Sequence, residues 1–325
     1  LYFVYVGTVV HLEAVKTGLE GLPKDQLPSV KETLAKGWPY LPPFVILVAM
    51  MLKGYSPFFA AFWSVISLVV LTTLKKETRM TPSKIVASLA AGAKSSLSVG
   101  ATVGVLGMIM GGISMAGLGV KFSAMILALA KGNLLITVLL TILAGNIVGM
   151  GLPTAASYVV LAILAAPALV QLGVPLLVAH LFCFWMSLAS NITPPVCVSA
   201  IAAAGIAGSD AMKTGFTALK YAAVIYVMPL TFVYGPAIMM YDATTVEILI
   251  AIGSVLLGIF ALAGALEGYL IDRVSAYERL ILGIAAIGLF IPGPITDTVG
   301  LALFFAMLFV QWRRKNARMH SAVSS

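Results

Sequence analysis

Charged residues and cysteines are both scarce in this chain of 325 residues. Only 10% of the residues are charged and 61% are hydrophobic, whereas a soluble domain carries about 25% charged and roughly 45–50% apolar residues. This composition excludes a soluble enzyme and a disordered protein. Cys183 and Cys197 lie in apolar segments and form neither a metal-ligand spacing nor a disulfide framework. We therefore expect an integral membrane protein with about eight to ten apolar segments near the length of a spanning helix.

The middle of the chain has no charged side chain at all. Residues 132–209 contain no Asp, Glu, Lys or Arg, which excludes a proton relay built from carboxylates in that stretch. The chain also lacks a phosphate-binding P-loop motif, which argues against ATP hydrolysis. His11, His180 and His320 have no partner at metal-ligand spacing, and His180 is predicted to be a hydrogen-bonded packing residue. These absences predict a protein that is not an enzyme.

Two polar breaks interrupt the uncharged stretch. They are residues 149–157 and residues 190–195, and both contain proline between apolar segments. Backbone that leaves the helix at membrane depth is tolerated only where protein buries it or where it lines a cavity. Discontinuous helices of this kind form ion and substrate sites through free carbonyls and half-helix N-termini. An ordinary turn at the first break and a proline kink at the second are the alternatives.

The breaks offer hydroxyls, backbone carbonyls and the amides of Asn146 and Asn191, and such neutral oxygens suit a monovalent cation such as sodium. Thr154 and Ser157 lie three residues apart on one face of the helix predicted after Pro153, so both hydroxyls point back at the first break. The predicted sodium or substrate ligands at the first break are Gly149, Met150, Gly151, Pro153, Thr154 and Ser157. Those at the second break are Ser190, Asn191, Thr193, Pro194 and Pro195.

Basic residues exceed acidic ones, 20 against 12, which gives a net charge of +8. Most of them lie at the ends of apolar segments, where they set membrane orientation rather than bind nucleic acid. The basic cluster that closes the last apolar segment is predicted to be cytoplasmic. Its members are Arg313, Arg314, Lys315 and Arg318. Counting spans back from this end places Asp242 outside.

Apolar runs predict further helices on either side of the breaks. Residues 41–52 and 57–74 predict a broken helix or a tight hairpin. Thr81-Pro82 predicts the start of a long helix that ends near residue 116, because threonine caps helices and proline fits the first helical position. Asp210 is predicted to cap the helix that follows it.

A few charged side chains near the ends of apolar segments need separate interpretation. Lys213 and Lys220 share one helix face, and we expect them to reach for the membrane interface. Contact with a substrate carboxylate is the alternative. Glu247 and Glu267 are predicted to be interfacial, and the sequence offers no basic partner for either.

Four stretches of the chain resemble a known family of transporters. They are residues 149–161 (GMGLPTAASYVVL), 172–175 (LGVP), 190–196 (SNITPPV) and 204–220 (AGIAGSDAMKTGFTALK). They resemble the large membrane subunit of TRAP transporters, the tripartite ATP-independent periplasmic transporters. The likeness is strongest to the branch in which the small and large membrane subunits are fused. It covers about residues 1–240, and the remainder looks like the extra C-terminal helices of that branch.

The resemblance implies a fold and a function. The fold is an all-α integral membrane protein, a polytopic helical bundle with a re-entrant hairpin and a discontinuous helix, which forms the second half of an inverted-repeat, elevator-type transporter. TRAP transporters import organic acids with sodium and receive them from a periplasmic substrate-binding protein. Residues 149–157 would form the tip of the second hairpin and residues 190–195 the second helix break. Sodium, the coupling ion, would be held by carbonyls and by side chains such as Thr193, with no cofactor, in the bacterial inner membrane.

The resemblance also divides the chain into three segments. Residues 1–40 are the end of a preceding helix and a polar linker, residues 41–240 are the second repeat, and residues 241–325 are C-terminal helices with a basic tail. The small subunit and the first repeat have no counterpart in the sequence, which begins with Leu1. We expect a C-terminal part of the fused protein, or a chain completed by a separate one. The alternative functions are a sodium- or proton-coupled organic anion transporter of this fold without a binding protein, and a membrane-embedded non-transport subunit.

Overall fold

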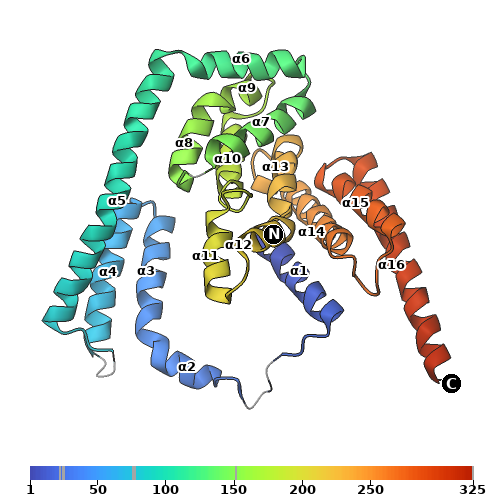
Figure 1. The fold of residues 1–325 in the computed structure, drawn as a ribbon, viewed down its shortest axis with the longest axis horizontal. Coiled ribbons are helices and arrows are strands. Elements are labelled where there is room, and N and C mark those ends of the chain that lie inside the picture. The colour runs from blue at the N-terminus through green and yellow to red at the C-terminus, as the bar shows by residue number, and fades with distance from the viewer. Residues whose placement is uncertain (22, 24–25, 75–77, 151, 324–325) are drawn as a thin grey trace. The chain divides into compact units, whose positions relative to one another are not determined.

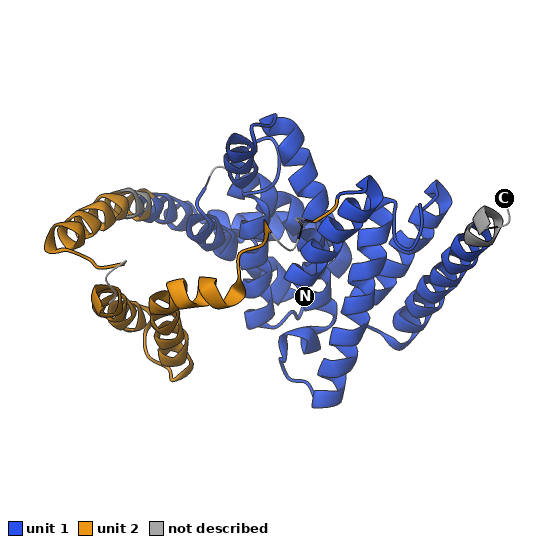
Figure 2. Cartoon of the chain, turned by 90° about the horizontal axis from the view of Figure 1, so that it is seen from below, with its two compact units in different colours: residues 1–19, 106–325 blue, residues 20–105 orange. Residues whose placement is uncertain are grey.

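A computed structural model describes residues 1–21, 23, 26–74, 78–150 and 152–323. Within these residues every regular element is a helix, and the one β-type contact is an isolated bridge between Tyr269 and Arg273. The predicted all-α membrane fold is confirmed. Figure 1 shows the helices in chain order, and Figure 2 shows the two compact units into which they pack.

The small unit comprises residues 20–105. Its helices are α2 (Val30–Gly37), η2 (Trp38–Tyr40), α3 (Leu41–Leu52), α4 (Pro57–Leu74) and the first part of α5 (Pro82–Met115). The two apolar runs therefore form a hairpin of two helices, as one of the two alternatives predicted. The Thr81 hydroxyl accepts from the Lys84 amide at 3.4 Å, which is the predicted cap of the long helix.

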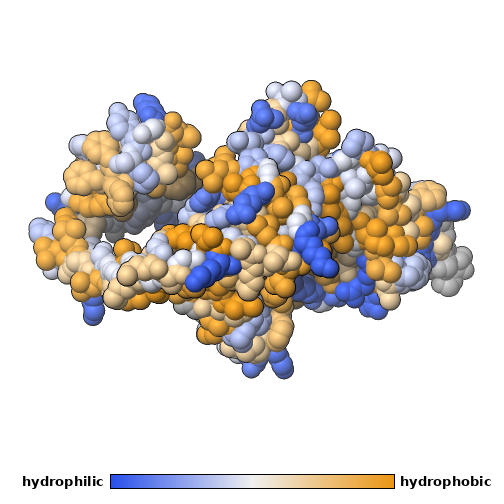
Figure 3. All heavy atoms as spheres, turned by 90° about the horizontal axis from the view of Figure 1, so that it is seen from above, coloured by the Kyte–Doolittle hydropathy of each residue, from blue (hydrophilic) through white to orange (hydrophobic). Residues whose placement is uncertain are grey.

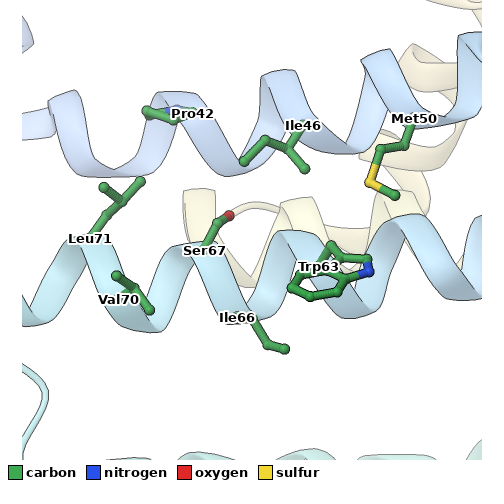
Figure 4. A pocket seen from close by; sticks show the side chains of 8 residues that line it. All are labelled: Pro42, Ile46, Met50, Trp63, Ile66, Ser67, Val70 and Leu71. Atoms are coloured by element: carbon green, nitrogen blue, oxygen red, sulfur yellow. The ribbon is translucent and has the colours of Figure 1, made fainter.

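The α3–α4 hairpin is apolar along its whole length. The Ser64 hydroxyl on α4 donates to the Pro43 carbonyl at 2.8 Å and ties the two helices together. Figure 4 shows Ile46 and Met50 of α3 facing Trp63 of α4 across a pocket of about 620 Å³. The lining of that pocket carries no charged side chain, so we do not expect an ion or a charged substrate to bind there.

The large unit comprises residues 1–19 and 106–325. It contains α1 (Tyr2–Thr17) and the last part of α5. The helices that follow are α6 (Leu118–Ala130), α7 (Leu134–Gly149), α8 (Thr154–Leu164), α9 (Ala166–Gln171), α10 (Leu176–Ala189), α11 (Val198–Ala207), α12 (Ala211–Tyr221), α13 (Val224–Tyr234), η3 (Pro236–Met239), α14 (Thr245–Glu267), α15 (Ala276–Phe290) and α16 (Pro294–Val323). The core is centred on α10, which packs against α7, α8, α9 and α13. Phe182, Cys183 and Met186 of α10 are fully buried there.

Six helices of the described residues are long and apolar enough to cross a membrane. The bent pair Val103–Met115 and Leu118–Ala130, which turns by 66°, raises that number to seven at most. The expected eight to ten segments were therefore too many, because the apolar helices α7, α10 and α11 are each shorter than 18 residues. Large hydrophobic side chains lie on the surface, such as Phe58 at 88% exposed. Figure 3 shows broad hydrophobic areas on the face that it presents, as a lipid-facing surface requires.

Local sequence signals explain where the central helices begin and end. The Asn133 side chain accepts from the Ile136 amide at 3.1 Å and caps α7. Pro153 and Pro175 precede α8 and α10, where the missing N–H of proline costs nothing. Asp210 caps α12 by accepting from the Lys213 amide at 2.8 Å, as predicted.

The C-terminal helices α14, α15 and α16 pack side by side, and α14 also packs against α1 from the other end of the sequence. Thr244 forms a capping box with Glu247, and the Ser275 amide donates to the Glu278 carboxylate at 2.7 Å. Glu267, at the end of α14, ion-pairs with Lys220 at 2.8 Å and with Lys16 at 3.6 Å. The expectation that Glu267 lacks a basic partner was wrong, because its partners lie far away in the sequence and are brought near by packing. Lys220 likewise is engaged with Glu267.

Candidate functional site

The tip of the α7–α8 hairpin contacts the break between α10 and α11 through three small residues. A Cβ atom added to Gly149 would lie 2.6 Å from Ser157 Oγ and 2.6 Å from both the Cβ and the Oγ of Ser190. Only a residue without a side chain fits this position, since real Cβ atoms do not approach so closely. Gly149 therefore permits a direct backbone approach between the two breaks, which lie about 40 residues apart in the sequence.

A second contact between the two breaks is polar. The Asn191 amide group donates to Thr154 Oγ1 at 3.2 Å and to the Ser187 carbonyl at 3.0 Å. The Asn191 carbonyl accepts from the Ser199 amide at 3.2 Å, so this residue also links the two sides of its own break. Asn191 thus connects the first turn of α8 to both halves of the broken helix.

Thr193 lies in the second break and connects it to two other helices. Its hydroxyl lies within hydrogen-bond distance of two acceptors. They are the Ala189 carbonyl at 2.7 Å and Asn146 Oδ1 on α7 at 3.0 Å. The same hydroxyl is hydrogen-bonded to the hydroxyl of Tyr226 on α13. The Asn146 amide nitrogen donates to the Ile142 carbonyl at 2.8 Å, which turns the amide oxygen towards Thr193.

Two serines lie buried where the breaks meet. The Ser190 hydroxyl donates to the Ser187 carbonyl at 2.9 Å. The Ser157 hydroxyl is fully buried and has no hydrogen-bond partner among the described residues. A buried hydroxyl without a partner costs about 1–3 kcal/mol. Its oxygen is therefore free to bind a further group, and a cation is a fitting one.

A cavity of about 380 Å³ opens beside the second break. Its lining residues come from α1, α8, α10, the break, α11 and α13, and they are Tyr2, Thr154, Trp185, Leu188, Asn191, Ile192, Ser199 and Ile225. The Trp185 indole N–H is buried without a hydrogen-bond partner in the described part of the chain. The cavity therefore combines apolar walls with neutral donors and acceptors.

The electrostatics of the site come from dipoles rather than charges. Residues 132–209 supply no charged side chain, and the described residues contain no group of three or more His, Cys, Asp and Glu that could hold a metal ion. The His180 ring is hydrogen-bonded to the Tyr158 hydroxyl at 3.0 Å, as expected of a packing histidine. Transition-metal binding and carboxylate acid–base chemistry therefore have no ligand set here.

Six of the predicted site residues contact another element near the two breaks: Gly149 lies against Ser157 and Ser190, Asn191 bonds to Thr154, and Thr193 bonds to Asn146 of α7. Met150 and Pro153 lie in the segment between α7 and α8. Pro194 and Pro195 lie in the turn after Thr193. These four residues set the course of the backbone at the two breaks. Gly151 lies outside the described residues.

Two residues of this network are not among the predicted ligands. Asn146 lies one helical turn before Gly149, and its amide in an uncharged helix was a signal that the sequence did offer. Tyr226 lies 33 residues after Thr193 and carries no such signal. A tyrosine in an apolar segment is ordinary until packing shows which group its hydroxyl meets.

Comparison with family models gives a match over residues 1–242 to the tripartite ATP-independent periplasmic transporter, DctM component. The chain belongs to this family. It is the membrane component of a TRAP-type secondary transporter and a multi-pass membrane protein, and its family is one of transporters rather than enzymes. Comparisons with curated proteins and with solved structures gave no match.

The extent of the match places the site within the DctM component. Both breaks, Tyr226 and the cavity fall inside residues 1–242. Helices α14–α16 begin after it.

Proposed function

We propose that this DctM-family chain binds sodium where the α7–α8 tip meets the α10–α11 break, and that sodium binding drives the import of an organic acid anion. The observation that carries the proposal is the contact between the breaks through neutral oxygens. Ser157 contributes a buried hydroxyl that has no partner among the residues that the structure describes, and Thr193 contributes a hydroxyl surrounded by oxygens. Hard cations take oxygen ligands, and a cage without carboxylates suits a single positive charge.

The anion is proposed to bind in the cavity beside the second break. Thr154, at the N-terminus of α8, and Ser199, in the first turn of α11, both line it. Helix N-termini carry positive partial charge and free N–H groups, which favour a carboxylate. The bound cation would add attraction for the same group, so sodium and anion would each raise the affinity for the other.

The whole transporter is proposed to work as an elevator in the bacterial inner membrane. Its other parts are a small membrane subunit and a first repeat, in the same or another chain, and a periplasmic protein that delivers the substrate. Membership of the DctM family supports these partners. The C-terminus is proposed to be cytoplasmic, since the basic residues of α16 cluster there.

Two other functions compete with this proposal. A transporter of the same fold without a binding protein would share the sodium site but would import substrate from solution. A non-transport membrane subunit would explain the helices but not two adjoining breaks with a buried hydroxyl that no other described residue satisfies. The contact between the breaks favours a transporter.

The test is Thr193→Ala in the assembled transporter, reconstituted in proteoliposomes with its binding protein. Uptake of organic acids is measured under an inward sodium gradient, with potassium replacing sodium at constant ionic strength as reference. We expect sodium-dependent uptake to fall to background, because Thr193 loses its oxygen at the break. Uptake that persists with unchanged sodium dependence would show that Thr193 is not part of the ion site.

Thr141→Ala is the matched control for this test. The Thr141 hydroxyl is also buried on the hairpin, but the hydrogen bond that it donates stays within α7, to the Thr137 carbonyl at 2.8 Å. We expect this variant to retain the sodium dependence of the parent. Equal insertion of both variants into the membrane shows that neither substitution acts through folding.

A further inference from the structure

Tyr226 brings a third helix to the second break. It lies near the start of α13, is partly buried, and its hydroxyl is hydrogen-bonded to Thr193 Oγ1. Asn146 reaches the same oxygen from α7. The Thr193 hydroxyl is therefore the point at which α7, the break and α13 meet.

Counting protons at Thr193 indicates a role for Tyr226. A threonine hydroxyl has one proton and two lone pairs. Two of its neighbours, the Ala189 carbonyl at 2.7 Å and Asn146 Oδ1 at 3.0 Å, can only accept, so Thr193 gives its proton to one of them. The arrangement that pairs the most groups has the Tyr226 hydroxyl donating to one Thr193 lone pair, because Tyr226 is the neighbour with a proton to give. The second lone pair of Thr193 is left over.

The count leaves more acceptors than protons. The Ala189 carbonyl already accepts from the Ile192 amide at 3.1 Å, and Asn146 Oδ1 is turned inwards by the hydrogen bond from its own amide nitrogen to Ile142. Oxygens that converge with an excess of lone pairs repel one another unless a positive charge lies among them. The geometry thus favours a cation, provided that the Thr193 hydroxyl keeps its orientation.

We propose that Tyr226 is a positioning residue for the cation site, whose hydroxyl holds the Thr193 hydroxyl with its free lone pair available to the ion. This inference rests on the proposed function, because it assumes that sodium binds at the break. Tyr226 acts through Thr193 and need not touch the ion. Its loss would leave the ligands in place but poorly oriented, which lowers ion affinity more than the rate of transport.

The test compares Tyr226→Phe with the parent in the assembled transporter. Uptake is measured against sodium concentration at constant ionic strength, and sodium-dependent thermal stabilisation of the purified protein is measured in parallel. We expect the half-saturating sodium concentration to rise about two- to tenfold, the range that one neutral hydrogen bond is worth. The maximal uptake rate at saturating sodium should stay within about twofold of the parent, because no ligand is removed.

Tyr158→Phe is the matched control, since it removes a tyrosine hydroxyl from the same unit. That hydroxyl is hydrogen-bonded to His180 and not to the break. We expect the sodium dependence of Tyr158→Phe to equal that of the parent. A change of the same size in both variants would assign the effect to general packing and overturn the role of Tyr226.

The remaining outcomes separate this inference from the proposed function. A parent that depends on sodium and a Tyr226→Phe variant with the same half-saturating concentration would overturn the inference alone. A Tyr226→Phe variant that loses maximal rate without a shift in sodium affinity would also overturn it. A parent whose uptake and thermal stability ignore sodium would overturn both.

Discussion

Gly149 sets how closely the hairpin tip approaches the helix break. Its neighbours across the contact are Ser157 and Ser190, at distances that leave no room for a side chain. The requirement is steric rather than conformational, because Gly149 lies at the helical end of α7 and not among the glycines with positive φ. A methyl group added at Gly149 would therefore push the hairpin tip and the helix break apart.

Gly149→Ala is expected to lower sodium affinity by at least about fivefold, because inserting a methyl group there strains the contact by about 1–3 kcal/mol. The measurement is the half-saturating sodium concentration for uptake. Gly205→Ala on α11 is its control, since a Cβ at Gly205 has no neighbour within 4 Å. A Gly149→Ala variant with parental sodium affinity would mean that the contact between the breaks does not shape the ion site.

Residue types alone predicted which polar residues lie at the two breaks but not the contacts that they make, and their role as ion ligands stays a prediction. Proline next to Thr, Ser and Asn in an uncharged stretch predicted both breaks. Backbone polar groups that proline frees at membrane depth cost free energy unless protein buries them or they line a cavity. Asn191 and Thr193 were found in this way, and the structure shows both in hydrogen bonds between elements. Tyr226 was not, because its contribution depends on which helix packs against the break.

Ion pairs connect the end of α14 to α12 and to α1. The Glu267 carboxylate at the end of α14 is fully buried as a side chain and lies between Lys220 of α12 and Lys16 of α1. Its Oε1 atom has no hydrogen-bond partner among the described residues. A buried charge with incomplete hydrogen bonding is stable only while its partners are present.

Lys220→Met is expected to destabilise the protein by roughly 1–3 kcal/mol, because it leaves the buried charge of Glu267 with only the more distant Lys16. The double variant Lys220→Met/Glu267→Gln should be less destabilised than Lys220→Met, since it removes both charges. Thermal unfolding in detergent measures the order of stabilities. Lys213→Met, which changes an exposed lysine near the start of the same helix, should have no effect. A double variant less stable than Lys220→Met would contradict the pairing.

Element boundaries follow from local chemistry, whereas their pairing does not. The starts of α5, α7 and α12 coincide with capping side chains that the sequence displays. The partners of Glu267 could not be predicted, because Lys16 and Lys220 come from segments separated from it by most of the chain or by a whole helix. Whether residues 41–74 form one broken helix or a hairpin was likewise open until the packing of α3 on α4 was known.

At the scale of the whole molecule, the family match and the packing divide the chain differently. The DctM match ends at residue 242, but α14, which follows it, packs against α1 from the beginning of the chain. The helices after the match are thus integrated with the large unit rather than appended to it. The three segments expected from the sequence, residues 1–40, 41–240 and 241–325, remain a prediction.

The orientation of the molecule gives a prediction at the same scale. Helices α14 and α16 are long and apolar enough to span, and we expect the shorter α15 to cross as well. Residue 242 and the basic cluster at the end of α16 should then face opposite sides of the membrane. A fluorescent protein fused after residue 325 should fluoresce, and alkaline phosphatase fused there should be inactive. Fusions after Asp242 should give the reverse pattern. The same pattern at both positions would exclude three crossings between them.

The sequence by itself determined that the chain lies in a membrane, that its regular elements are helices, and which polar residues lie at the two breaks. Few charges force the chain into lipid, lipid forces its backbone into helices, and the uncharged stretch limits the site to neutral oxygens. Tertiary structure alone decided that the two breaks touch at Gly149, that Glu267 meets Lys220, and that Tyr226 reaches Thr193. The physical reason is range: hydrophobicity, capping and proline act within a few residues, whereas each of these contacts joins segments that only the packing of helices brings together.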